Sequence, residues 1–271
     1  MKPVFCGALI PTHGGKIVGF HIKGRNIPGL LGEIATLLAK YGLNIVHLAN
    51  SSLREGEVYD LFIAVDFSDA KKNPSSIARE IKRLEKVLEV EVRKPAYGFL
   101  LDEGFFPLEV GGAKVTCLGY ESLKALVSDL REKFGSGVST ILYVLGRKMG
   151  RLIFDSQILP SMSRRRRLNI RKSLEILRIL CQGYGWCRVE ILSVSDDRAK
   201  IKILNSFEGE VLREEEALSS ELKGCYCMKG ILDGVLENVV GSNVRVRELS
   251  CVSRGGDGCV FSISVKKPLK P

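Results

Sequence analysis

Residues 225–265 read CYCMKGILDGVLENVVGSNVRVRELSCVSRGGDGCVFSISV, a helical pattern followed by two alternating strands. In the first of these strands, Val244, Val246 and Glu248 share the same parity, so the Glu248 carboxylate points toward the side that the valines bury. An uncompensated charge on that side would be very costly. We therefore expect a positive partner to neutralise Glu248.

Cysteines around this strand can hold such a partner. Cys251 follows Glu248 after two residues, and Cys259 begins the second strand after a glycine-rich turn, so a hairpin brings the two thiols together. Cys225, or Cys227 as the alternative, adds a third sulfur from the helix. Three sulfurs and one carboxylate suit zinc, and four protein ligands leave no open position, which indicates a structural Zn2+ site.

The spacing of these residues also resembles a known family, the 4-vinyl-reductase domain. The resemblance rests on Cys225, Gly230, Gly234, Glu248, Cys251 and Cys259, and on the Leu145-Gly146 and Met149-Gly150 steps. In the related sensor domains of phenol- and xylene-responsive transcriptional activators, residues at these positions bind a structural zinc beside a pocket for a small aromatic molecule. The resemblance thus implies a zinc-stabilised sensor domain, and it favours Cys225 over Cys227 as the ligand.

Length and composition predict two domains and a soluble, cytoplasmic protein. With 271 residues, of which 45% are hydrophobic, the chain exceeds a usual single domain and can fill two modest cores. No apolar run approaches the ~20 residues needed to cross a bilayer, and no secretion signal is recognisable. The eight cysteines point to metal binding or burial rather than to a disulfide framework, with intracellular proteins of thermophiles as the known exception.

Residues 1–95 are predicted to form a ferredoxin-like domain, because residues 17–94 follow the order strand, helix, strand, strand, helix, strand. The start of the first helix, together with Tyr41-Gly42-Leu43-Asn44-Ile45, resembles an ACT domain. The resemblance implies a homodimer and an amino-acid effector held at Asn26, Ile27, Pro28, Gly29 and Leu30. Free N–H groups at a helix start attract a carboxylate, and Gly29 lets a ligand approach closely. Asn26 stands where the family often has an aspartate for the ligand's ammonium group, so a purely dimerising ACT domain is the alternative.

Residues 96–271 are predicted to form the second domain. Apolar periodicity predicts helices that begin at Ser122 and Val138, another helix after the basic segment, and strands at 186–194 and 199–204. By the family resemblance, helices and an antiparallel sheet enclose a ligand cavity. We expect this cavity to be apolar and lined by Phe134, Leu142, Leu145, Met149, Tyr184 and Trp186. The whole chain is thereby assigned to the α+β class.

The formal net charge of +10 is locally concentrated where Arg164, Arg165, Arg166 and Arg167 follow one another. Guanidinium groups pair with phosphates, so this run is the candidate contact for phosphate or nucleic acid. No base-reading element such as a helix-turn-helix accompanies it, which favours a solvated connection.

The remaining candidates favour structure over catalysis. The three histidines, His13, His21 and His47, all stand in the first domain, and no serine or cysteine triad can be proposed. Cys181 and Cys187 flank a turn and are interpreted as core residues, with a disulfide or a second metal site as the alternatives.

These observations lead to one hypothesis and two alternatives. The chain is expected to be a ligand-sensing regulatory protein rather than an enzyme. It would bind a small apolar or aromatic molecule in a zinc-stabilised domain and dimerise through an ACT domain. The first alternative is an enzyme or accessory factor of tetrapyrrole (vinyl reductase) metabolism. The second is a nucleic-acid-binding protein that uses the run from Arg164 to Arg167.

Overall fold

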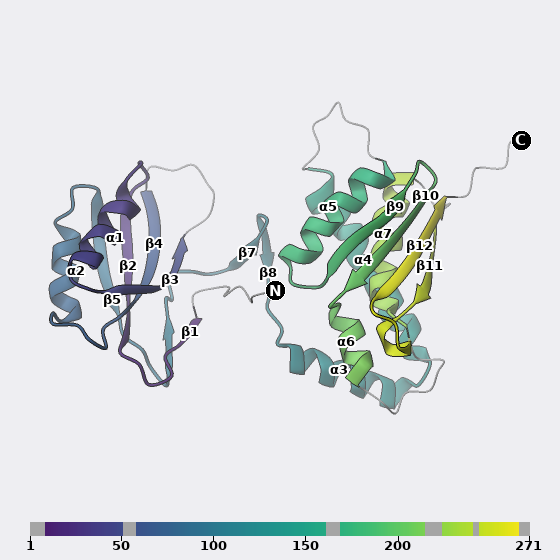
Figure 1. Cartoon of the computed structure of the whole chain (residues 1–271), viewed down its shortest axis with the longest axis horizontal. Helices are drawn as coiled ribbons and strands as arrows, with labels where there is room; N and C mark the ends of the chain where they lie inside the picture. The colour runs from purple at the N-terminus through teal and green to yellow at the C-terminus, as the bar shows by residue number, and fades with distance from the viewer. Residues whose placement is uncertain (1–8, 51–57, 161–168, 215–223, 241–243, 266–271) are drawn as a thin grey trace, which may run out of the picture. The chain divides into compact units, whose positions relative to one another are not determined.

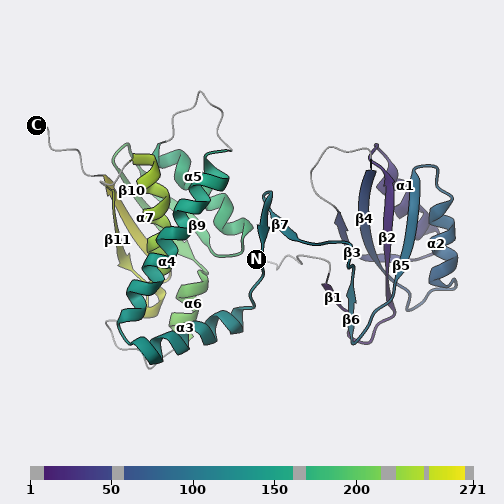
Figure 2. The same cartoon turned by 180° about the vertical axis from the view of Figure 1, so that it is seen from behind.

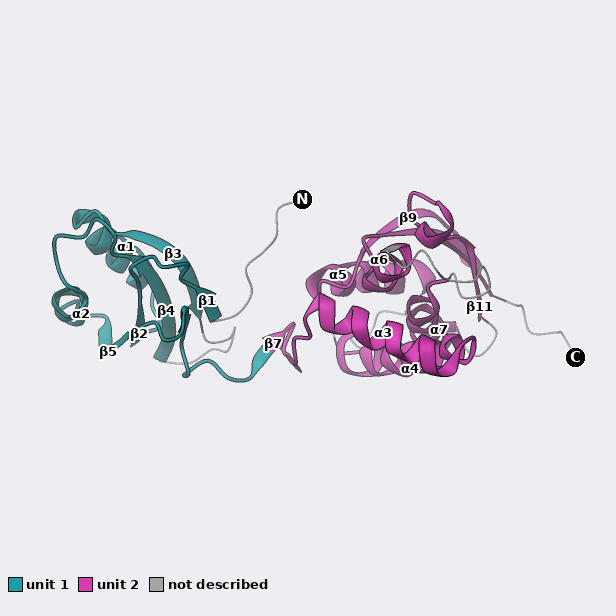
Figure 3. Ribbon diagram, turned by 90° about the horizontal axis from the view of Figure 1, so that it is seen from below, with its two compact units in different colours: residues 1–108 teal, residues 109–271 magenta. Residues whose placement is uncertain are grey.

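The computed structural model describes residues 9–50, 58–160, 169–214, 224–240 and 244–265. The chain divides into two compact units, Met1–Leu108 and Glu109–Pro271, which Figure 3 colours separately. Each unit is described by itself. Within the described residues, every helix is too short or too polar to span a lipid bilayer.

The first unit is built on a four-stranded antiparallel sheet in the order β3-β4-β2-β5 (Figure 1). Its elements are β2 Ile17–Arg25, α1 Leu30–Lys40, β3 Asn44–Asn50, β4 Val58–Asp66, α2 Pro74–Lys82 and β5 Val87–Arg93. The order expected for residues 17–94 is therefore the order found. Both helices turn their apolar stripes, such as Ile34 and Ile81, onto one face of the sheet, where Phe20 and Ile63 are fully buried.

A short ribbon covers part of the other face of this sheet. Its strands, β1 (Leu9–Pro11) and β6 (Phe99–Leu101), pair antiparallel, and Ile10 and Leu100 pack with Phe62 and Ala64. The predicted boundary between residues 95 and 96 differs from the division of the structure because β6 pairs with a strand of the first unit.

A buried polar cluster fastens the segment after β6 to the sheet. The Asp102 side chain is fully buried, and its carboxylate lies 2.5 Å from Nδ1 of His21 and accepts a hydrogen bond from the Gly104 N–H. On the other side of the ring, Nε2 of His21 lies 3.1 Å from the Asp60 carboxylate. These polar contacts give His21 a structural role in this cluster.

Replacing Asp102 by asparagine is expected to loosen the β1–β6 ribbon. The amide would put an N–H2 group against buried donors, and an unsatisfied buried group costs about 1–3 kcal/mol. Hydrogen exchange in the full chain should then become faster at residues 9–11 and 99–105 and stay unchanged at residues 225–265. Glu103→Gln is the matched control, because Glu103 is an exposed neighbour. Equal exchange in both variants would refute a role for Asp102 in holding the ribbon.

The second unit combines helices with a four-stranded antiparallel sheet in the order β11-β12-β10-β9. Its helices are α3 Tyr120–Phe134, α4 Gly137–Ile153 continued by the π-helix Phe154–Ile158, α5 Ile170–Gly183, α6 Phe207–Glu214 and α7 Tyr226–Val240. Its strands are β9 Arg188–Val194, β10 Arg198–Leu204, β11 Val244–Ser250 and β12 Cys259–Val265, preceded by the two-stranded hairpin of β7 Leu108–Val110 and β8 Ala113–Val115. This confirms the mixed helical and antiparallel architecture, while α6 was not predicted.

Helices α4 and α7 lie side by side, as Figures 1 and 2 show, and glycines let their backbones touch. A methyl group on Gly146 would lie 2.1 Å from the Cys227 carbonyl oxygen, and one on Gly150 would lie 2.3 Å from that of Ile231. From the other helix, Gly230 faces the Tyr143 carbonyl in the same way. The contact holds the start of α7 against α4, directly after Cys225.

Candidate metal centre

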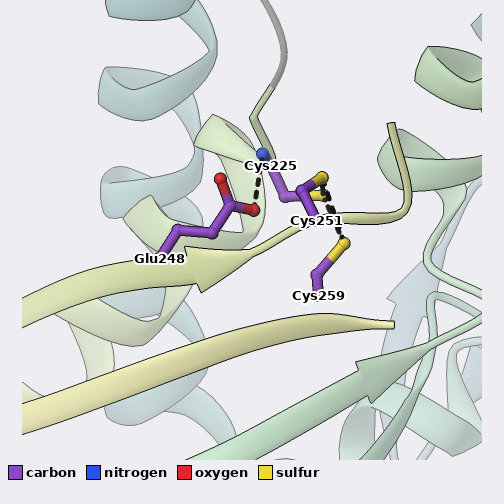
Figure 4. A group of neighbouring side chains, drawn as sticks. All are labelled: Cys225, Glu248, Cys251 and Cys259. Carbon is purple, nitrogen blue, oxygen red and sulfur yellow. Dashed lines mark hydrogen bonds between the residues drawn. The ribbon is translucent and has the colours of Figure 1, made fainter. Parts of the chain in front are cut away.

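Three separate segments of the second unit bring Cys225, Glu248, Cys251 and Cys259 together (Figure 4). Cys225 directly precedes α7, and its carbonyl accepts the first bond of that helix from the Lys229 N–H. Glu248 stands near the end of β11, Cys251 follows that strand, and Cys259 begins β12. One ligand atom of each residue lies within 4.8 Å of the others, so the group can hold a metal ion.

The β11–β12 hairpin positions three of these side chains. Glu248 pairs with the fully buried Phe261, and the strand then bulges before Ser250. A single helical turn, Val252–Arg254, reverses the chain, and Gly255 at φ +82° completes the turn. The Glu248 side chain is 12% exposed, which confirms that it lies on the buried side of the strand.

The distances between the sulfurs fit a shared metal ion. Sγ of Cys225 lies 3.7 Å from Sγ of Cys251 and 3.2 Å from Sγ of Cys259, and the third distance is 3.3 Å. A disulfide would need about 2.05 Å. Zinc–sulfur bonds of about 2.3 Å in a tetrahedron place sulfurs about 3.8 Å apart, so a small expansion of this triangle accommodates the ion.

Hydrogen bonds orient the carboxylate toward the sulfurs. Oε1 of Glu248 accepts the Cys225 N–H at 3.1 Å, and Oε2 accepts a guanidinium N–H of Arg254 at 3.2 Å. Burial raises the pKa of Glu248 to about 7, against the opposing effects of Cys225 and Arg254. A cation at the cluster would favour the ionised carboxylate, which is the form that binds metal.

The thiols also perturb one another. Hydrogen bonds from Cys225 and Cys259 lower the pKa of Cys251 to about 2, and the bond to Cys251 raises the pKa of Cys225 well above its usual value. The Ser253 hydroxyl donates a further hydrogen bond to the Cys251 sulfur at 3.2 Å. The mutual hydrogen bonds thus favour one thiolate, at Cys251, and hold Cys225 as its thiol donor, and a bound dication would favour loss of the remaining protons.

Sequence reasoning missed two buried residues beside the cluster. Glu208 of α6 is fully buried and accepts the backbone N–H groups of Cys227 and Met228 at 3.0 and 3.1 Å. The Ser206 hydroxyl lies 3.8 Å from the Cys225 sulfur. Burial raises the pKa of Glu208 to about 7. No local signal distinguishes Glu208 from the other acidic residues of its segment.

The other cysteines in the part of the chain that the structure describes lie outside the cluster. Cys227 is buried, but its thiol is not part of the group that can hold a metal, so the structure favours Cys225 at this position. Cys181 and Cys187 lie in the hydrophobic core of the second unit, where a hydrogen bond to Cys181 raises the pKa of Cys187. Cys117 is exposed.

The residues predicted to line an apolar cavity occupy different environments. Leu142 is buried, and Met149 and Trp186 pack against the same core. The rings of Tyr184 and Trp186 stack with centroids 5.0 Å apart. By contrast, Phe134 and Leu145 are 55% and 52% exposed. Leu142, Met149 and Trp186 thus contribute to the core of the second unit, whereas Phe134 and Leu145 are largely exposed.

The turn predicted to bind an amino acid is formed as expected, with Gly29 at φ +94° before α1. Lys86 covers it, because its ammonium group donates to the Pro28 carbonyl at 3.3 Å and pairs with Glu33. Asn26, Ile27 and Pro28 are exposed, whereas Leu30 is buried in the core. The candidate phosphate contact at Arg164, Arg165, Arg166 and Arg167 lies outside the described residues.

A shallow hollow of about 440 Å³ opens beside the cluster. Its lining comprises Cys225, Tyr226, Lys229, Arg247, Glu248 and Leu249. Lys229 and Arg247 of this lining are cationic, and Arg254 donates a hydrogen bond to the Glu248 carboxylate. Three thiolates and one carboxylate carry more negative charge than a dication balances, and these cations can offset the excess.

Comparison with known proteins places the cluster within a recognised domain. Among solved structures, the chain is similar to the phenol-responsive sensory domain of the transcription activator PoxR with phenol, at 22% identity and a TM-score of 0.50 over 57% of this chain and 78% of that one. It is also similar to a vinyl-4-reductase family protein from Methanocaldococcus jannaschii, at 25% identity and a TM-score of 0.34 over 57% and 85% of the two chains.

The first unit has weaker counterparts. One is the ACT domain of a GTP pyrophosphokinase from Chlorobium tepidum, at 15% identity and a TM-score of 0.24 over 29% of this chain and 97% of that one.

No curated protein matches the chain. The V4R domain model matches residues 214–265, the part of the chain that contains Cys225, Glu248, Cys251 and Cys259.

Proposed function

We propose that this chain is a ligand-sensing regulatory protein whose second unit holds a structural Zn2+ ion and binds a small apolar or aromatic molecule. The observation that carries the proposal is the convergence of three thiols and one carboxylate from three segments. Three sulfur donors favour zinc over magnesium or calcium, which prefer oxygen donors throughout. Bound there, the ion would fasten the β11–β12 hairpin to the start of α7.

The sensor role is supported by the fold of the second unit. PoxR, whose sensory domain shares this fold, responds to phenol, and the V4R match covers the segment with the metal ligands. We propose that the ligand lies near the stacked rings of Tyr184 and Trp186 and the apolar side chains of Leu142 and Met149. Aromatic rings and methionine suit a small apolar guest. Phe134 and Leu145 would lie at its outer edge, because both are more than half exposed.

For the first unit we propose an ACT-like domain that joins two chains. The element order and the Gly29 turn support this assignment. An amino-acid effector at the turn would have to displace the Lys86 ammonium group, which already bonds to Pro28 and Glu33. The observation favours dimerisation over amino-acid binding.

Native mass spectrometry of the freshly purified full chain tests the proposal, because one spectrum reports metal, subunit number and any retained small molecule. We expect one zinc ion per chain and a dimer. Binding of a small aromatic is then tested with phenol as the probe and cyclohexanol as the control, and only phenol should raise the unfolding temperature of the second unit. A chain without metal would refute the zinc centre, and equal shifts with both probes would refute aromatic recognition.

The two alternatives make different predictions in the same experiments. An enzyme or accessory factor of tetrapyrrole metabolism would retain a pigment visible in the mass and absorption spectra. A nucleic-acid-binding protein would bind DNA of arbitrary sequence with steep salt dependence, and replacing Arg164, Arg165, Arg166 and Arg167 by glutamine would abolish that binding.

A further inference from the structure

We propose that the first turn of α6, residues 206–209, positions and tunes the metal centre from outside its ligand set. The inference rests on the zinc centre proposed above. Ser206, Glu208 and Gly209 stand on one short segment, and each makes a different contact with Cys225 or with the residues that follow it. None of the three is a metal ligand, so their role would be to fix where Cys225 lies and how much charge its sulfur carries.

Ser206 supplies a hydroxyl to the Cys225 sulfur. Its side chain is buried, and its oxygen already accepts the Gly209 N–H at 2.9 Å. The hydroxyl hydrogen is therefore available for the Cys225 sulfur, 3.8 Å away. A hydrogen bond to a metal-bound thiolate withdraws charge from the sulfur and weakens its donation to the ion, which changes the absorption of a bound transition metal.

Glu208 fixes the beginning of α7. The first N–H groups of a helix have no partner within the helix, and Glu208 accepts those of Cys227 and Met228. A carboxylate at this end also interacts favourably with the helix dipole. Because Cys225 lies two residues before Cys227, the contact holds the thiol ligand at its place relative to the β11–β12 hairpin.

Gly209 makes this approach sterically feasible. A methyl group there would lie 3.0 Å from the Val252 side chain, 3.5 Å from the Cys225 sulfur and 2.7 Å from the Ser206 oxygen. Val252 belongs to the turn between Cys251 and Cys259. The segment is thus packed against both the helical and the hairpin halves of the centre, which is the arrangement expected of a layer that supports metal ligands.

The test uses the full chain loaded with Co2+, whose absorption bands report the thiolates and the geometry around the ion. Two variants are compared with wild type, Ser206→Ala and Glu208→Gln. We expect Glu208→Gln to weaken metal affinity by about 10–100-fold in competition with a chelator. Ser206→Ala should shift the thiolate-to-cobalt charge-transfer band, because the Cys225 sulfur loses its hydrogen bond.

Two controls separate positioning from stability. Glu210→Gln removes the same charge from the same helix, at a half-buried position. Ser173→Ala removes a buried hydroxyl that donates to the Asn169 carbonyl in α5. Ser173→Ala should lower the unfolding temperature, and both controls should leave the cobalt spectrum and the affinity unchanged.

The outcomes distinguish this inference from the proposed function. Wild-type protein that binds no cobalt refutes the metal centre itself. If wild-type protein binds cobalt, and Ser206→Ala and Glu208→Gln have the same spectrum and affinity as wild type, only the role of residues 206–209 is overturned. If Glu208→Gln does not fold, Ser206→Ala alone decides, because an unchanged charge-transfer band in that variant contradicts the hydrogen bond to Cys225.

Discussion

Replacing Gly230 by alanine is expected to destabilise the second unit, although alanine is the better helix former. A methyl group at Gly230 would lie 2.3 Å from the Tyr143 carbonyl oxygen and 2.7 Å from the Arg147 nitrogen, both backbone atoms of α4. The gain in helix propensity is about 1 kcal/mol. Overpacking typically costs about 1–3 kcal/mol. We expect the cost at Gly230 to reach or exceed the upper end of this range, because two helix backbones must separate and no flexible side chain can move aside instead. Leucine should prevent the native packing of α4 and α7 altogether.

Thermal unfolding followed by circular dichroism measures this effect. A unit of this size loses about 2–4 °C of melting temperature per kcal/mol. Gly137→Ala is the matched control at the start of α4, since the nearest atom to its added methyl group is 4.0 Å away. It should be neutral or slightly stabilising. If Gly230→Ala has the same melting temperature as wild type, the close helix contact is not a feature of the protein in solution.

The same contact links helix packing to the metal centre. Gly146 faces the Cys227 backbone, two residues after Cys225, whereas Gly150 faces Ile231 farther along α7. Gly146→Ala should therefore move the start of α7 and reduce metal content. Gly150→Ala should lower stability with a smaller loss of metal. We expect this difference in metal content because Gly146 contacts α7 closer to Cys225 than Gly150 does.

Periodicity predicted the local structure of this region because it is a property of neighbouring residues. The alternation Val244, Val246, Glu248 placed the carboxylate on the buried side, and the hairpin then brought Cys251 and Cys259 together. The sequence marked Gly230 as part of a family pattern. It could not show that this glycine meets the Tyr143 backbone, since such a contact depends on how two distant helices cross.

Residues whose partners lie far away in the sequence were not predictable. Glu208 is one of several acidic residues in its segment, yet it is fully buried against the first turn of α7. Asp102 is buried directly after a ribbon whose three-residue strands carry too short a pattern to recognise. Apolar spacing likewise could not separate the buried Leu142 from Leu145, which is more than half exposed. Helical periodicity identifies a face and leaves open what covers it.

Replacing Cys225 by alanine is expected to abolish metal binding, whereas Cys227→Ala should retain it. Both thiols are buried and two residues apart, but only the Cys225 sulfur lies within 3.7 Å of the sulfurs of both Cys251 and Cys259. Structural zinc contributes about 10–16 kcal/mol in zinc-finger peptides, which is comparable with the whole stability of a domain. An ordinary point substitution such as Cys227→Ala costs about 1 kcal/mol.

Loss of the ion should act locally, because the two units have separate cores. In Cys225→Ala, or in wild type treated with a strong chelator, hydrogen exchange should become fast at residues 225–265 and stay slow at residues 17–93. Cys117→Ser, at an exposed position, controls for the loss of a thiol. Elemental analysis gives the metal content of each variant.

The pair of alanine variants also decides between a metal centre and a packed cluster of thiols. If the three sulfurs only filled a core, removing either buried cysteine would lower stability by similar amounts, and a chelator would have no effect on wild type. If they hold an ion, Cys225→Ala and chelated wild type should show the same exchange pattern, and adding zinc should restore only the latter. That equivalence is expected because the dication balances the charge of the thiolates and adds to the single positive charge that Arg254 places beside Glu248.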